Sequence, residues 1–291
     1  MAPSNRDYVE SLKSYFDGAL PKSALLAYDR NSENPKTPDI FIKSLVKDFQ
    51  DQLPGVTLIS MPFTGSLGTE NAPGTNDFAT LISRICFPNV SPPVFFAGRQ
   101  NDLEVFLDQL EQQQCLSPVT VLTAGSDLGS LVQERSETLA EHRITVVYTS
   151  ATDPVGWKSH LDARSGYWPP HFEDFLNRFQ TVFPTGKLDD GNAIAQHDAV
   201  ATAATALALF EAGQSGSASS SDERELPDNL TTQLLSINGA KKTVPGAGGD
   251  ISFSLRGPNN STTGDPIGKP VPLLQIPAAP EDPSDQPYIT K

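Results

Sequence analysis

The chain has 291 residues, a formal net charge of -14 and a pI near 4.6. This length suits one large domain or two lobes, and a hydrophobic content of 37% is ample for buried cores. Nucleic acids and anionic membrane surfaces bind clustered lysines and arginines, so the acidic balance argues against both as partners.

Neither a membrane-spanning segment nor a secretory signal is expected. The longest apolar stretch, residues 199–209, is too short for a membrane span and contains Thr202 and Thr205, so we expect no direct membrane insertion. Residues 1–7 have no basic region followed by an apolar one, so they do not resemble a secretory signal. If Met1 is the true start, this predicts a cytoplasmic protein.

The N-terminal half repeats one pattern five times, namely a short apolar run, a turn and an amphipathic stretch. The apolar runs cover residues 25–28, 56–61, 94–97, 119–122 and 144–148. Runs of this kind are typical of strands buried on both faces, and their alternation with helices predicts an α/β fold with a doubly wound parallel sheet. Such a sheet binds ligands at the carboxyl ends of its strands.

Helical spacing of apolar residues predicts the segments around these strands. In chain order the helices are expected over residues 7–16, 40–49, 78–85, 103–110 and 131–142. The pattern changes after Ser150. Residues 153–170, which contain both tryptophans, are expected to form an irregular crossover, followed by helices over 170–183 and 192–212.

The C-terminal part mixes loops with short elements. We expect a flexible Ser/Gly loop over 214–221, a short helix over 226–237, and strands over 250–254 and 271–276. The tail, 277–291, is rich in proline and aspartate and is expected to be disordered.

The two cysteines, Cys86 and Cys115, each end a helical segment shortly before a strand. Consecutive strands are usually neighbours, so the thiols could form a disulfide, or they could be two small buried hydrophobic residues. A disulfide would indicate an oxidising compartment, which conflicts with the missing signal. Neither cysteine belongs to a metal-ligand spacing, so no metal site is expected.

Several short motifs occur in an order that resembles a known family. They are ALLAYD at 24–29, VTLI at 56–59, FTG at 63–65, NDF at 76–78, PVFFAG at 93–98, HDAV at 197–200, GDISF at 249–253 and KPVPL at 269–273. This order resembles the second lobe of type I periplasmic binding proteins, in particular the leucine/isoleucine/valine-binding branch of ABC transporter receptors. One departure is His197, where the family usually has an aromatic residue before Asp-Ala-Val.

The resemblance implies a non-enzymatic solute-binding protein that catches an amino acid or similar small polar solute between two lobes and works with an ABC permease outside the cytoplasm. It implies a second lobe over 1–152, crossover and first-lobe helices over 153–245, and return strands with a hinge over 246–276. Most of the first lobe would be missing. Apolar faces around Phe172, Phe175, Phe179 and Ala203 would then lack their partner, which a first-lobe polypeptide or a homo-oligomer could supply.

The resemblance also places ligand-binding residues at the ends of the strands. They are Asn31, Ser32, Gly65, Ser66, Gly98, Arg99, Ser126, Asp127 and Ser150. Arg99 could grip a ligand carboxylate, or it could pair with Asp102 or Asp127. Asp127 could hold a ligand ammonium, or it could cap the helix that follows.

Other motifs do not support catalysis or a cofactor. In residues 125–129 the serine is displaced from the centre of the glycine pair that a nucleophile elbow requires, and residues 245–249 lack the third glycine and the helix of a dinucleotide loop. The four histidines share no ligand spacing. We therefore expect no enzyme, cofactor or metal, and keep a protein-interaction or sensor module as the alternative function.

Overall fold

The five predicted strands form one sheet in the computed structural model. Their bounds are β1 Ser23–Asp29, β2 Thr57–Phe63, β3 Val94–Ala97, β4 Val119–Ala124 and β5 Ile144–Thr149, and β8 Leu273–Ile276 is added at one edge. The order is β2-β1-β3-β4-β5-β8, with β8 antiparallel to β5 and every other neighbouring pair parallel. The predicted α/β class with a doubly wound sheet is therefore confirmed.

The structure describes residues 4–33, 38–65, 78–87, 91–125, 128–164, 166–188, 191–215, 233–234, 236–237, 243–253, 266–267, 271 and 273–276. The chain divides into two compact units. Unit 2 comprises residues 5–150 and 271–291, and unit 1 comprises residues 1–4 and 151–270. The expected 214–221 loop beyond Ser215, most of the expected 226–237 helix and the expected disordered tail lie outside the described residues.

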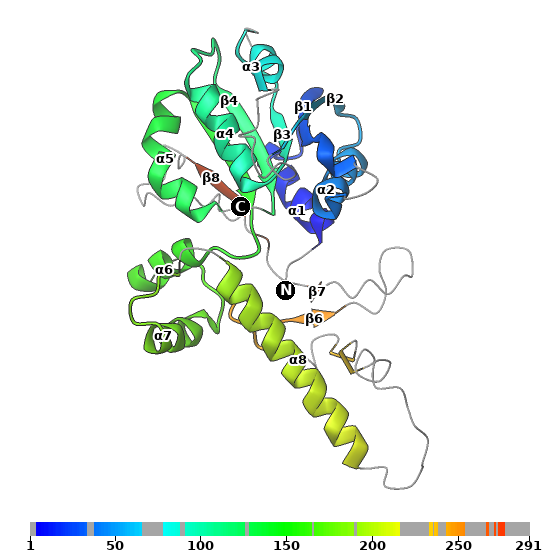
Figure 1. Cartoon of the computed structure of the whole chain (residues 1–291), viewed down its shortest axis with the longest axis vertical. Helices are drawn as coiled ribbons and strands as arrows, with labels where there is room; N and C mark the ends of the chain where they lie inside the picture. Colours follow the sequence, from blue (N-terminus) through cyan, green and yellow to red (C-terminus); the bar gives the residue numbers. More distant parts are fainter. Residues whose placement is uncertain are drawn as a thin grey trace. The chain divides into compact units, whose positions relative to one another are not determined.

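Helices cover both faces of the sheet in unit 2 (Figure 1). They are α1 Asn5–Lys13, with a 3-10 turn over Ser14–Phe16, then α2 Ile40–Gln52, α3 Phe78–Cys86, α4 Gln100–Glu111 and α5 Gly129–Glu141. Alternate strand residues point to opposite faces. Phe96 therefore packs with α3 and α4 against Phe78 and Phe106, whereas Phe95 contacts Phe49 of α2 with ring centroids 5.1 Å apart.

The expectation that β2 is buried on both faces is wrong. Among the described residues β2 is an edge strand that pairs only with β1, and most of its side chains are exposed or half-buried. Phe63, at its end, is the buried exception. Pro62 fits this position, because a proline has no N–H to donate and is tolerated on an edge strand.

Unit 1 is built mainly from helices, α6 Pro154–Ala163, α7 Phe172–Val182 and α8 Asn192–Ser215. Helix α6 lies within the segment predicted to be irregular, so that prediction is wrong. The Asp153 side chain accepts the Gly156 N–H at 3.2 Å, and Pro154 occupies the start of the helix, where its missing N–H has no cost. Arg164 ends the helix in the left-handed conformation.

Short strands complete what is described of unit 1. β6 Ser252–Phe253 pairs antiparallel with β7 Pro266–Ile267, and Ile251 bridges Val244. Of the segment 246–276, expected to return to the second lobe, β8 joins the six-stranded sheet of unit 2, while β6 and β7 pair with each other within unit 1. The reason is local, since Ile251 and Phe253 are buried against Ala206 of α8, Ile237 and Val244.

The glycine-rich turn 245–249 encloses a carboxylate. Asp198 of α8 is fully buried, and its Oδ1 accepts the Ala247 N–H at 2.6 Å while its Oδ2 accepts the Gly248 N–H at 3.2 Å. A Cβ on Gly246 would stand 2.9 Å from the Asp198 carboxylate, so a side chain there would clash. This turn is therefore occupied by the protein's own anion.

Helix α8 consists mostly of apolar and small residues and has no distinct polar face. By length and composition alone, Asn192–Ala212 could cross a membrane, with a mean hydropathy of 1.2, which differs from the expectation based on the shorter segment 199–209. Buried core helices of soluble proteins pass the same test, but only 22% of this window is buried in the structure. The buried, hydrogen-bonded Asp198 within α8 indicates a helix packed in a protein fold.

Part of the apolar surface of α7 and α8 is uncovered in unit 1. Phe172 is buried and meets Trp157 edge-on at 5.4 Å, so the expectation that it lacks a partner is wrong. By contrast, Val182 and Phe183 at the end of α7 are 67% and 55% exposed, and Val200 of α8 is 69% exposed. Ala203 and Leu207 are also exposed on α8.

Candidate ligand-binding site

The carboxyl ends of β1 and β2 are joined through the side chain of Asp29. Its Oδ1 accepts the backbone N–H groups of Asn31 and Gly65, each at 2.9 Å. The Asn31 side chain donates in turn to the Gly65 carbonyl at 3.4 Å. Two of the predicted site residues, Asn31 and Gly65, are therefore brought together, and the residue that holds them is one that the sequence analysis did not select.

A second carboxylate lies beside the same glycine. A Cβ on Gly65 would stand 2.4 Å from Asp29 Oδ2 and 3.0 Å from Asp102 Oδ2, and both acids are almost fully buried. Burial raises the pKa of the Asp29 carboxyl, and the negative charges of Asp102 and Asp39 raise it further, whereas the N–H groups of Asn31 and Gly65 lower it. This strand end therefore concentrates acidic oxygens.

Arg99 was predicted to bind a ligand carboxylate, but in the structure it binds a carboxylate of the protein itself. Its Nε and Nη2 donate to Asp39 Oδ2 at 2.9 and 2.7 Å, and its guanidinium lies 5.2 Å from the centre of the Phe41 ring. The sequence suggested Asp102 or Asp127 as the partner of Arg99 in an ion pair. In the structure the pairing residue is Asp39, and the Asp102 side chain instead accepts the Arg99 backbone N–H at 3.3 Å.

The start of α2 thus covers the end of β3 and the end of β4. Asp39 caps α2 by accepting the Ile42 N–H at 3.2 Å, which fixes the carboxylate that Arg99 holds. Phe41 lies against Gly125, where an added Cβ would meet the ring at 2.8 Å. Gly125 has a φ of 67°, a conformation that glycine adopts without strain.

The remaining predicted site residues fall into two groups. Ser32, Gly98 and Ser150 are buried within unit 2, and a Cβ on Gly98 would stand 2.5 Å from the Phe96 ring, which explains the glycine by packing. Ser66, Ser126 and Asp127 lie outside the described residues, so their roles stay predictions. Within the described residues, no group of three or more histidine, cysteine or acidic side chains could hold a metal ion.

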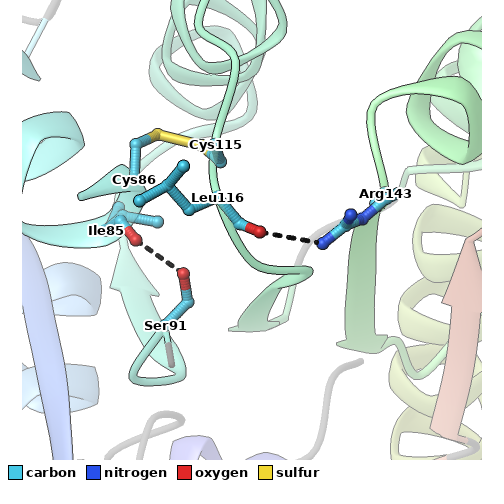
Figure 2. The surroundings of a disulfide bond; sticks show 6 residues. All are labelled: Ile85, Cys86, Ser91, Cys115, Leu116 and Arg143. Carbon is cyan, nitrogen blue, oxygen red and sulfur yellow. Dashed lines mark hydrogen bonds between the residues drawn. A yellow bond between two sulfur atoms is a disulfide. The ribbon is translucent and has the colours of Figure 1, made fainter. Parts of the chain in front are cut away.

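Cys86 and Cys115 form a disulfide, with Cα atoms 4.1 Å apart (Figure 2). It ties the end of α3 to the loop that follows α4. The surrounding loops are held by hydrogen bonds, from Ser91 Oγ to the Ile85 carbonyl and from Arg143 Nη2 to the Leu116 carbonyl at 3.3 Å. The disulfide lies near the amino ends of the strands, so it supports the sheet rather than the candidate site.

Asp29, Asp39 and Phe41 lie at the candidate site, and the sequence analysis did not select them. Asp29 ends the ALLAYD motif, directly after the apolar run 25–28, and was given no role. Asp39 lies 60 residues before Arg99, and no spacing rule connects such a pair. A usable signal was Asp39 directly before the apolar spacing of α2, which is typical of a helix cap.

No protein-family model matches the sequence, and no curated protein matches it significantly. Solved structures do match. A putative branched-chain amino acid ABC transporter protein from Rhodospirillum rubrum has a TM-score of 0.53 and 14% identity, over 98% of this chain and 66% of that one. The fatty acid ABC transporter substrate-binding protein from Thermomonospora curvata has a TM-score of 0.55 and 12% identity, over 94% and 60%.

A third structure of the same kind is the extracellular ligand-binding receptor from Verminephrobacter eiseniae, with a TM-score of 0.55 and 12% identity, over 95% of this chain and 64% of that one. The chain thus spans about two thirds or less of the length of these three proteins. At such low identity the likeness concerns the fold. The chain has the fold of the type I periplasmic binding proteins, as its motif order predicted.

Proposed function

We propose that this chain forms the greater part of an extracytoplasmic substrate-binding protein of an ABC-type transporter. The observation that carries the proposal is a doubly wound sheet whose carboxyl ends gather polar groups, in a fold shared with solved substrate-binding proteins. Ligands bind at this edge of open α/β sheets. The disulfide supports an oxidising compartment, and no reaction chemistry is proposed.

The proposed ligand is an amino acid or similar small polar solute, partnered in transport by a membrane permease. Asn31, Ser32, Gly65, Ser66, Gly98, Arg99, Ser126, Asp127 and Ser150 are the proposed contacts. A ligand carboxylate that reaches Arg99 has to compete with Asp39, which holds it through two N–H groups. This competition lowers the affinity unless the ligand brings further contacts.

We also propose that the chain alone binds weakly, because it spans about two thirds or less of the length of the substrate-binding proteins whose fold it shares. Calorimetric titration with a panel of amino acids tests this on the chain as given and on a version extended by a first lobe. The extended protein is expected to bind at least one amino acid, and Asp39→Asn to tighten that binding by freeing Arg99. Absence of binding by the extended protein across the panel would overturn the amino acid proposal.

A protein-interaction module is the second candidate, favoured by the exposed apolar side chains Val182, Phe183, Val200 and Leu207. The covering partner would be a first-lobe polypeptide or a second copy of the chain. Light scattering over a concentration series tests this. Self-association that disappears in Val200→Ser with Leu207→Ser supports the candidate, and a monomer at all concentrations that binds no apolar dye contradicts it.

A further inference from the structure

The outer edge of β2 carries backbone hydrogen-bonding groups that no described strand pairs with. Along a strand, the N–H and C=O groups of successive residues point to alternate sides. The Thr57 N–H donates to the Lys22 carbonyl at 2.9 Å, so Thr57, and after it Ile59, face β1. Leu58 and Ser60 therefore direct their N–H and C=O groups to the other side, the outer edge of the sheet.

The open part of this edge is short. Pro62 is the next outward position after Ser60, and a proline has no N–H to offer there. Val56, the outward position before Leu58, donates its N–H to the Leu53 carbonyl at 3.2 Å. Pairing through N–H groups of the outer edge is thus confined to Leu58 and Ser60.

β2 also lacks the charges that commonly keep edge strands apart. No charged residue occurs between Asp51 and Glu70 in the sequence, whereas edge strands are often protected by lysines or other charged side chains. Ile59, in the middle of β2, is 38% exposed, although its neighbour on β1, Leu25, is buried. A charged peptide finds no complementary charge along this strand. The occupant that fits is a neutral extended strand, bound through its main chain.

We propose that two copies of this chain dimerise by antiparallel pairing of their β2 strands about a two-fold axis at Ile59. The edge is its own complement, because Leu58 then lies opposite Ser60 of the second copy and Ser60 opposite Leu58, so the N–H of each meets the C=O of the other. Ile59 meets Ile59 of the second copy at a non-hydrogen-bonded position, where side chains approach most closely. The two-fold axis closes this contact at two copies.

The dimer is expected to be weak. One pair of short strands buries less than the roughly 1,200 Å² of a standard interface, and the net charge of -14 on each copy opposes association. Analytical ultracentrifugation of the full chain, up to millimolar concentration and at about 0.15 M NaCl to screen distant charges, is expected to show monomer and dimer in equilibrium. The dimer is expected to persist in Val200→Ser with Leu207→Ser, which separates it from association through α8.

Two variants of β2 and one matched control test the pairing. Ser60→Pro removes an N–H that points outward, and is expected to weaken dimerisation by about tenfold or more, because the two-fold axis repeats the lost hydrogen bond. Ile59→Lys places two ammonium groups opposite each other and is also expected to weaken it. Val105→Lys on α4 makes the same change at a side chain of similar exposure, 40%, and is expected to dimerise like the unmodified chain.

Ile59→Cys tests the register, because the two native cysteines are already paired with each other. Two cysteines at the axis lie within reach of a disulfide, so mild oxidation is expected to give a covalent dimer, and Ser60→Cys, opposite Leu58, is expected to give less. The proposal is overturned by a monomer up to millimolar concentration, by Ser60→Pro and Ile59→Lys that are folded by circular dichroism and dimerise unchanged, or by equal cross-linking of the two cysteine variants. A monomer that binds a neutral extended peptide would also overturn it, in favour of a strand from another protein.

Discussion

The two units use similar helices in different ways. In unit 2 the helices α3 and α4 bury their apolar residues against a six-stranded sheet, and Phe63, Phe78, Phe96 and Phe106 form one aromatic cluster. In unit 1 the strands described, β6 and β7, are two residues long, and α7 and α8 leave large apolar side chains exposed. Amphipathic helices alone do not complete a core, because a sheet supplies most of the opposing surface.

The contrast between the two units can be tested most directly by removing one aromatic side chain from each unit. Phe96→Ala removes a fully buried ring that stacks on Phe63 at 5.2 Å and on Phe106 at 5.5 Å, and is expected to cost about 4 kcal/mol of unit 2 stability. Phe183→Ala, in unit 1, removes a ring that is 55% exposed and is expected to cost less than about 1 kcal/mol. Urea unfolding followed by circular dichroism measures both.

The tryptophans assign the transitions, because both, Trp157 and Trp168, lie in unit 1. Tryptophan fluorescence therefore reports unit 1, while circular dichroism reports both units. Phe96→Ala is expected to shift the dichroism transition and leave the fluorescence transition in place. If Phe96→Ala and Phe183→Ala lower the free energy of unfolding by the same amount, the difference in packing between the two units does not affect stability.

The disulfide gives the next largest expected effect, confined to unit 2. It closes a loop with a sequence separation of 29, and its reduction is expected to cost about 3 kcal/mol through the entropy of the unfolded chain. Urea unfolding with and without dithiothreitol measures this. The double variant Cys86→Ser with Cys115→Ser should unfold at the same urea concentration under both conditions. An unmodified chain insensitive to dithiothreitol contradicts the prediction.

In unit 1 the sharpest test is Asp198→Asn. The carboxylate accepts two backbone N–H groups from the 245–249 turn, whereas an asparagine offers one oxygen and turns an NH2 group toward the other donor. We expect a loss of about 2 kcal/mol in the transition followed by tryptophan fluorescence. Asp174→Asn, an exposed change on α7, is the control and should leave that transition unchanged. Equal midpoints would mean that this turn does not stabilise unit 1.

The sequence predicted the local elements well where one pattern dominated. β3 has the expected bounds, and α2, α3 and α4 contain the apolar residues whose spacing predicted them. Two errors had visible signals. Pro62 indicates an edge strand, and Asp153 followed by Pro154 is a typical helix start that the tryptophan- and glycine-rich composition obscured.

The site was less predictable, because its geometry depends on contacts between distant residues. The ends of the strands indicated Asn31 and Gly65, which Asp29 does bring together. The pairing of Arg99 with Asp39 depends on where α2 begins above β3, and the burial of Asp198 depends on a turn 49 residues later in the chain. Neither the Arg99–Asp39 pair nor the burial of Asp198 can be predicted from the periodicity of a single sequence.

The smallest expected effect is a pH dependence of unit 2 that originates at Asp29. Burial, with the charges of Asp102 and Asp39, raises the folded-state pKa of this carboxyl above its usual value of 3.8. Between the usual and the raised value the folded state binds more protons than the unfolded state, so the free energy of unfolding falls as the pH rises through this window. At neutral pH the ionised Asp29 therefore destabilises unit 2.

Asp29→Asn removes this charge, and its side-chain oxygen can still accept the N–H groups of Asn31 and Gly65. The variant is expected to equal or exceed the unmodified chain in stability at pH 7, and to lose its advantage as the pH falls below the usual carboxyl pKa. Urea midpoints from pH 3 to pH 7 measure this, with the exposed Glu10→Gln as baseline. If Asp29→Asn is instead less stable at pH 7 and retains the pH dependence of the unmodified chain, the ionised carboxylate stabilises the strand end. The buried carboxylates of Asp29 and Asp102 beside Gly65 would then stabilise unit 2 themselves. Their burial would not be a cost that the packing of helices on both faces of the sheet has to offset.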